Sequence, residues 1–98
     1  MKEIIQDQYG NTIYLTDERW QHIAQRHPVL QGFKNEVLKT IRSGKREQDA
    51  FYPYKFYYRK AFKNLPRRFT HIEVVVIFGF KDDQPNNFVT TAYPMIIV

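Results

Sequence analysis

The sequence predicts an α+β domain in which an N-terminal hairpin and two helices pack on an antiparallel β-sheet meander. Its 98 residues match the size of one domain, so we expect residues 1–98 to share a single core. Helical periodicity is confined to the first half of the chain, and alternating aromatic and β-branched residues dominate the second half. Helices that precede a run of strands are typical of α+β domains, whose helices cover one face of the sheet.

The chain is expected to begin with a small hairpin. Strands near residues 3–7 and 12–15 flank a break in the alternating pattern at residues 9–11. Gly10 and Asn11 tolerate the positive φ that a tight reversal demands. We therefore expect the two strands to pair with each other.

Two helices should follow the hairpin. Asp17, or the threonine before it, can cap a helix over residues 17–27, which ends before Pro28. A second helix is expected over residues 31–43, with Gly44 at its C-cap position. Four apolar residues fall on one face of this second helix: Phe33, Val37, Leu38 and Ile41.

The rest of the chain is expected to form three strands, near residues 53–62, 69–80 and 87–96. Turn-forming residues separate them at 64–67 and 82–87. Connections this short place successive strands side by side and antiparallel, which makes the predicted meander.

The charge of the chain points to an anionic partner. Fifteen basic residues outnumber ten acidic ones, for a formal net charge of +5. The excess is concentrated in residues 55–71, which contain no acid and in which basic and aromatic residues alternate closely. The basic residues of this stretch are Lys55, Arg59, Lys60, Lys63, Arg67 and Arg68.

Several classes of protein are excluded or disfavoured. The absence of cysteine excludes a disulfide scaffold, a thiol nucleophile and a thiolate zinc site. No apolar run is long enough to span a membrane, and the acidic N-terminus is unlike a signal peptide, so we expect a cytoplasmic protein that does not bind membranes. Glycine-rich nucleotide motifs and a histidine-carboxylate metal motif are both missing, so we expect neither cofactor nor metal.

The first predicted helix carries groups suited to acid-base chemistry. Arg19, His22 and Arg26 fall on one helical face, and His27 follows directly. Imidazole can accept or donate a proton near neutral pH, and arginine fits phosphate oxygens. The alternative is that the arginines are merely solvated and that His27 simply ends the helix.

The first long strand of the second half combines cations with phenols. Each of its faces carries both, which suits a phosphate clamp with a stacking platform. The alternative is an edge strand whose lysines only deter pairing with another chain. One face carries Lys55, Tyr57 and Arg59, and the other carries Phe56, Tyr58 and Lys60.

The central and last strands offer further polar side chains. Thr91 and Tyr93 share one face of the last strand. Threonine is a good strand former, so Thr91 can equally be structural, and the same interpretation applies to His71 and Glu73 on the central strand.

Three segments of the chain resemble a known superfamily. They are DERWQHIAQRHP at residues 17–28, YYR at 57–59 and FVTTAYP at 88–94. Together they resemble the phage- and toxin-associated nuclease-like families of the barnase, EndoU, colicin and RelE superfamily. The resemblance implies a RelE-like fold and a metal-independent ribonuclease, often a toxin with a cognate antitoxin or immunity protein. The catalytic residues that it implies are His22, Arg26, His27, Tyr58, Arg59 and Thr91.

We therefore expect an RNA endonuclease in which the ribose 2′-OH attacks the adjacent phosphate. His22 or His27 would act as base or acid, Arg26 and Arg59 would hold the phosphate, and Tyr58 would stack on a base or relay a proton. Thr91 would donate to a phosphate oxygen. The alternatives are a non-catalytic RNA-binding module and a phage accessory domain that binds protein. The residues expected to bind RNA are Lys55, Tyr57, Lys60, Lys63, Arg67, Arg68 and Tyr93.

Overall fold

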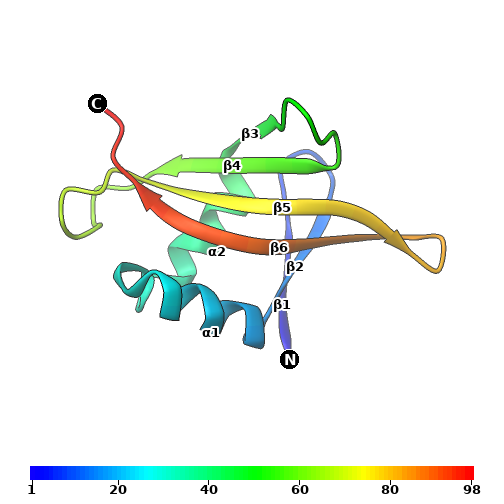
Figure 1. Ribbon diagram of the computed structural model, residues 1–98, viewed down its shortest axis with the longest axis horizontal. Coiled ribbons are helices and arrows are strands. Elements are labelled where there is room, and N and C mark those ends of the chain that lie inside the picture. The colour runs from blue at the N-terminus through cyan, green and yellow to red at the C-terminus, as the bar shows by residue number, and fades with distance from the viewer.

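Six strands form one mixed sheet, with both helices packed against one of its faces, in the computed structural model of residues 1–98 (Figure 1). The strand order is β1-β2-β6-β5-β4-β3. The strands are β1 (Lys2–Gln6), β2 (Thr12–Thr16), β3 (Lys45–Gln48), β4 (Lys55–Ala61), β5 (His71–Lys81) and β6 (Gln84–Met95). The helices are α1 (Asp17–Arg26), the short 3₁₀ helix η1 (Pro28–Leu30) and α2 (Lys34–Ser43).

The predicted α+β class is confirmed, but the sheet is larger than a meander and is not wholly antiparallel. The N-terminal hairpin adds to the sheet, because β2 pairs with β6 in parallel through Ile13–Asn87 and Tyr14–Phe88. The short strand β3 also pairs with β4, at the opposite edge. Its polar sequence, KREQ, lacks the alternation that identifies a strand, because an edge strand of this kind buries almost nothing.

The long hairpin of β5 and β6 is the largest feature of the sheet (Figure 1). Its turn consists of Asp82 and Asp83 alone, both with positive φ, so the expected turn over 82–87 is too long. Pro85 fits within β6 because at that point β6 has a partner on one side only.

Helix α1 begins where the sequence predicts and α2 begins later. The hydroxyl of Thr16 caps α1 by accepting a hydrogen bond from the Arg19 amide at 3.0 Å. The expected helix over 31–43 begins only at Lys34, because η1 precedes it and Gly32 adopts a φ of +84°.

The hydrophobic core lies between the helices and one face of the sheet. Side chains alternate along a strand, so the opposite face of β4, β5 and β6 carries the residues between the core positions. No helix of the structure is both long enough and apolar enough to cross a membrane. The core consists of Ile5, Ile13, Leu15, Ile23, Leu30, Val37, Ile41, Tyr58, Leu65, Ile72, Val74, Val76, Val89 and Ala92.

Candidate functional site

A row of three polar side chains crosses the sheet on the face opposite the helices. Strand register aligns Arg59 of β4 with Glu73 of β5, and Glu73 with Tyr93 of β6. The Arg59 guanidinium donates to Glu73 Oε1 at 3.0 Å, and the Tyr93 hydroxyl donates to Glu73 Oε2. Glu73 is only 6% exposed, so a nearly buried carboxylate has a hydrogen bond to each of its oxygens.

The protonation state of Tyr93 follows from this environment. Burial raises the pKa of the Tyr93 phenol above its ordinary value, and its hydrogen bond to Glu73 raises it further. Tyr93 is therefore neutral at physiological pH and acts as a donor to Glu73.

A depression of about 640 Å³ lies beside this row, between β3, β4 and β5. Glu73 and Arg59 contribute to its lining, together with Lys45, Lys60 and His71. The lining as a whole contains four basic residues and two acidic ones, Glu47 and Glu73, and this excess of positive charge favours an anionic ligand.

A second row lies next to the first on the same face. Tyr57 of β4 is aligned with Val75 of β5, which is aligned with Thr91 of β6. A β-bulge beside Val75 shifts the register of β6, and there Thr90 donates to the Val75 carbonyl at 3.2 Å. The structure therefore places Tyr57 and Thr91 on the face that carries Glu73.

Of the two helix histidines, only His27 approaches this face. His27 ends α1, and its ring centroid lies 6.2 Å from that of Tyr93. His22 is exposed and lines a separate hollow together with Arg19. Arg26 is exposed in the last turn of α1 and makes no ion pair. The helix motif therefore contributes one residue, His27, to the surroundings of Glu73.

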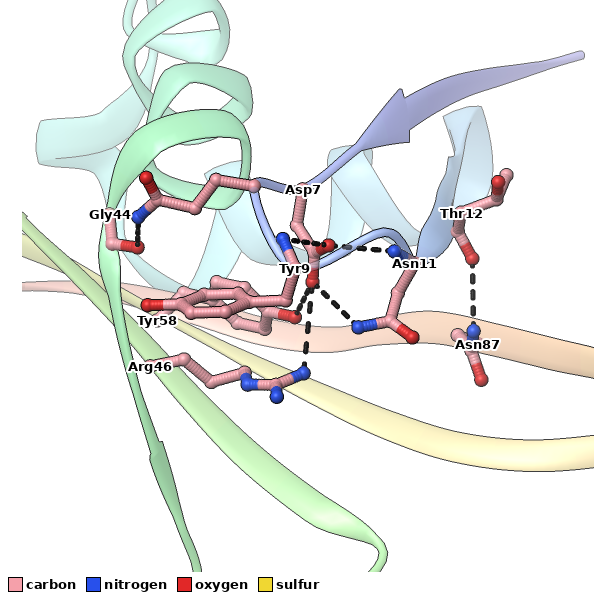
Figure 2. Close-up of polar contacts among 9 residues, drawn as sticks. Asp7, Tyr9, Asn11, Thr12, Gly44, Arg46, Tyr58 and Asn87 are labelled. Carbon is pink, nitrogen blue, oxygen red and sulfur yellow. Dashed lines mark hydrogen bonds and ion pairs between the residues drawn. The ribbon is translucent and has the colours of Figure 1, made fainter.

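Tyr58 lies on the other face of the sheet, and its expected role in base stacking is wrong. Its side chain is fully buried, and its hydroxyl donates to the carboxylate of Asp7 (Figure 2). Asn11 and the Tyr9 amide donate to the same carboxylate, and Arg46 Nη1 lies 3.8 Å from it. Tyr58 thus anchors the β1–β2 turn to β4. The alternation of the YYR motif separates its two tyrosines between faces but does not indicate which face the helices cover.

The basic stretch of residues 55–71 does not form one surface. Lys60 contributes to the lining of the depression but pairs with core residue Ile72, so its side chain lies on the face of Tyr58. The Lys55 ammonium lies 5.6 Å from the ring centroid of Tyr57. Arg59 also lines the depression, whereas the remaining cations of the stretch lie in the exposed loop between β4 and β5, outside it; they are Lys63, Arg67 and Arg68.

Sequence reasoning undervalued two residues of the site and missed a third. Glu73 and His71 were open to a purely structural interpretation, because nothing in a valine-rich strand indicates that its acid will lie beside Arg59. Lys45 carries no sequence signal at all, since it belongs to the unexpected strand β3.

Comparison with protein-family models, with curated proteins and with solved structures found no match for this chain.

Proposed function

We propose that the protein is a metal-independent RNA endonuclease that acts on the open face of the sheet. The observation that carries this proposal is the buried Glu73 carboxylate between Arg59 and Tyr93, at the edge of a cationic depression. The resemblance of the chain to the barnase, EndoU, colicin and RelE superfamily supports the same activity.

In the proposed reaction the ribose 2′-oxygen forms a bond to phosphorus and the bond from phosphorus to the 5′-oxygen breaks. Glu73 accepts the proton of the 2′-OH, since it is the carboxylate at the centre of the face. The products are a 2′,3′-cyclic phosphate and a free 5′-OH, which takes up one proton.

Arg59 is the group that binds the phosphate. Its side chain is 42% exposed, so a phosphate can reach the guanidinium and compete with Glu73 for it. Engaging the phosphate frees Glu73 Oε1 to act as a base. Lys45, which pairs with Arg59 in the sheet, adds positive charge where the phosphorane develops its negative charge.

Two histidines flank the row and are candidates to protonate the 5′-oxygen. His27 lies beyond Tyr93, at the β6 side. His71 lines the depression, and the Thr70 hydroxyl lies 2.6 Å from its Nδ1, which orients the ring. Replacing each histidine separately distinguishes the two assignments.

The test is incubation of RNA with wild-type protein and with Glu73→Gln, His27→Ala and His71→Ala in the presence of EDTA. Loss of a positioned base or acid costs about 10²- to 10⁴-fold in rate, so we expect Glu73→Gln and one histidine variant to fall in this range. Wild type should leave 2′,3′-cyclic phosphate ends. His22→Ala is the matched control, because this exposed histidine lies outside the site and should cleave like wild type.

Binding of RNA without cleavage is the second candidate function. It is favoured by the fact that both oxygens of Glu73 already accept hydrogen bonds within the protein. Intact RNA in the same assay, together with binding that Arg59→Ala weakens, would support this function and would contradict the nuclease. Undiminished cleavage by Glu73→Gln would contradict the assignment of Glu73 as the base.

A further inference from the structure

The loop that joins β3 to β4 presents three aromatic rings to solvent. Phe51 is 86% exposed, Tyr52 is 53% exposed and Tyr54 is 49% exposed. The loop spans residues 49–54 and contains no leucine, isoleucine, valine or methionine. Clustered aromatic exposure of this kind is uncommon unless the surface binds something.

Hydrogen bonds hold this loop in place. Asp49 Oδ2 accepts the amides of Phe51 and Tyr52, both at 2.9 Å, and Asp49 Oδ1 accepts the Tyr57 hydroxyl at 2.6 Å. The Tyr54 carbonyl accepts the Phe78 amide of β5 at 2.8 Å. The rings of Tyr52 and Tyr54 lie 5.8 Å apart. Because the backbone is already ordered, a ligand that binds these rings does not have to order the loop.

We propose that this loop is a nucleobase-binding site, which holds one or more unpaired bases of single-stranded RNA by stacking. Every base has a π-face, so phenylalanine and tyrosine rings bind unpaired bases with little regard to sequence. Bases in a duplex are already stacked on each other, so the substrate class is single-stranded RNA. The inference rests on the proposed function for the position of the reacting phosphate.

Strand β4 connects the loop to the open-face site. Lys55 and Tyr57 lie between the loop and Arg59 along this strand. Tyr57 contacts both regions, because it lines the depression and its hydroxyl donates to Asp49 of the loop. Arg59 is four residues beyond Lys55 along β4, a distance of roughly 13 Å at the rise of a strand. The stacked base is therefore not the one attached to the scissile phosphate but one further along the RNA.

A charged path joins the two ends of this surface. Lys55 supplies a cation between the aromatic loop and Arg59, where the backbone of a bound strand would pass. The carboxylate of Asp49 faces inward onto amides and a hydroxyl, so the loop presents rings rather than negative charge. This combination of rings and cations fits RNA better than it fits an apolar protein surface.

The experiment measures binding of a uniformly 2′-O-methylated single-stranded oligonucleotide, which cannot be cleaved by the 2′-OH route. Phe51→Ala and Tyr52→Ala should each weaken binding by about 5- to 100-fold, the range for one base that loses its aromatic partner. Tyr52→Phe should bind like wild type, because the ring is retained. Phe80→Ala is the matched control, since Phe80 is 79% exposed but lies on the β5–β6 hairpin.

Two further measurements distinguish base stacking from nonspecific binding of the RNA. The dependence of affinity on salt should be the same for Phe51→Ala and wild type, because no phosphate contact is lost. Single abasic substitutions, scanned along the oligonucleotide, should weaken wild-type binding at one or two positions and leave Phe51→Ala binding unchanged there.

The inference is overturned if Phe51→Ala and Tyr52→Ala bind like wild type, or if Phe80→Ala is equally weakened. It is also overturned if wild type forms dimers that Phe51→Ala abolishes while RNA binding is unaffected, since the loop then contacts a second copy. Failure of the proposed function has a different signature. If the protein binds RNA through the loop but never cleaves it, the stacking site is supported and the nuclease is contradicted. If it cleaves long RNA and the loop variants cleave equally well, the nuclease is supported and the stacking site is contradicted.

Discussion

Tyr57 and Tyr58 are neighbours in β4, but their side chains lie on opposite faces of the sheet. Tyr57 lies on the open face with Arg59, and Tyr58 is fully buried against Asp7 on the helix face. The two residues have the same chemistry and adjacent positions, but only one can meet a ligand. The face that each occupies follows from where the helices pack.

The buried pair of Tyr58 and Asp7 should contribute to stability and not to activity. Tyr58→Phe removes one donor from a buried carboxylate, so the free energy of unfolding should fall by about 1 to 3 kcal/mol. Urea denaturation measures this loss. Tyr93→Phe is the contrasting variant, because it removes a donor from Glu73 and should lower RNA cleavage. A Tyr58→Phe protein of wild-type stability would contradict the role of this pair.

Asp7 should also make stability depend on acid pH. Burial acts to raise the pKa of Asp7, but hydrogen bonds from Tyr58, Asn11 and Tyr9 outweigh it and hold the pKa below its ordinary value. In acid the unfolded chain therefore takes up a proton that the folded protein resists, so the free energy of unfolding should fall as the pH drops below about 4. Urea denaturation between pH 6 and roughly pH 2 measures the decline, and Asp7→Asn should reduce it. Asp83→Asn, in an exposed turn, is the control and should leave the decline unchanged.

At the scale of elements, Gly44 sets how closely the end of α2 approaches β4. A Cβ at this position would lie 2.3 Å from the Thr40 carbonyl oxygen and 2.8 Å from that of Arg59. Both neighbours are backbone, so a side chain at Gly44 can be accommodated only by moving the helix or the strand.

We expect Gly44→Ala to destabilise the protein by about 1 to 3 kcal/mol or more, as overpacking does elsewhere. The movement would also displace Lys45 and Arg59, so RNA binding should weaken. Thermal unfolding and RNA titration measure the two effects. Gly79→Ala is the matched control, because the nearest atom to its added carbon lies 3.4 Å away, and a comparable loss there would contradict this account.

The conformation of the β3–β4 loop also depends on specific contacts, in this case those of Asp49. Asp49 orders the β3–β4 loop through two backbone amides and the Tyr57 hydroxyl. The hydrogen bond from Tyr57 is the main reason that the pKa of Asp49 falls to about 2, with smaller contributions from the amides of Phe51 and Tyr52. Asp49 is therefore ionised at physiological pH, as its role of acceptor requires.

At the scale of the whole molecule, the contribution of the net charge of +5 to RNA binding depends on where the charged side chains lie. Lys45 and Arg59 lie side by side at the depression, although they belong to two strands. The helix side carries its own cations, such as Lys39, which have no part in the site.

Affinity for single-stranded RNA should accordingly fall with salt in a way that identifies the binding face. Each phosphate contact on a single strand contributes a slope of about −0.7 in a plot of log affinity against log salt. Lys45→Ala should make the slope less steep by about that amount, whereas Lys39→Ala should leave it unchanged. Titrations from low to moderate salt measure both slopes. Equal slopes for the two variants would mean that the depression does not bind the RNA backbone.

Local patterns in the sequence determined much of this protein. The periodicity of residues 17–43 predicts two helices, and the alternation after residue 53 predicts the three long strands of the sheet. The polar residues of β4 and β6 were therefore identified as candidates, and Arg59, Tyr57, Thr91 and Tyr93 do share one face.

Only the tertiary structure decided which face of the sheet is open and what lies at its centre. Alternation assigns neighbouring side chains to opposite faces, but the covered face depends on helices packed from elsewhere in the chain. Asp7 and Tyr58 are 51 positions apart in the sequence, and Arg59 and Glu73 are brought together by strand register. Neither contact can be recognised from the local sequence pattern. The physical reason is that secondary structure follows from short-range periodicity, whereas a functional site is assembled by long-range packing.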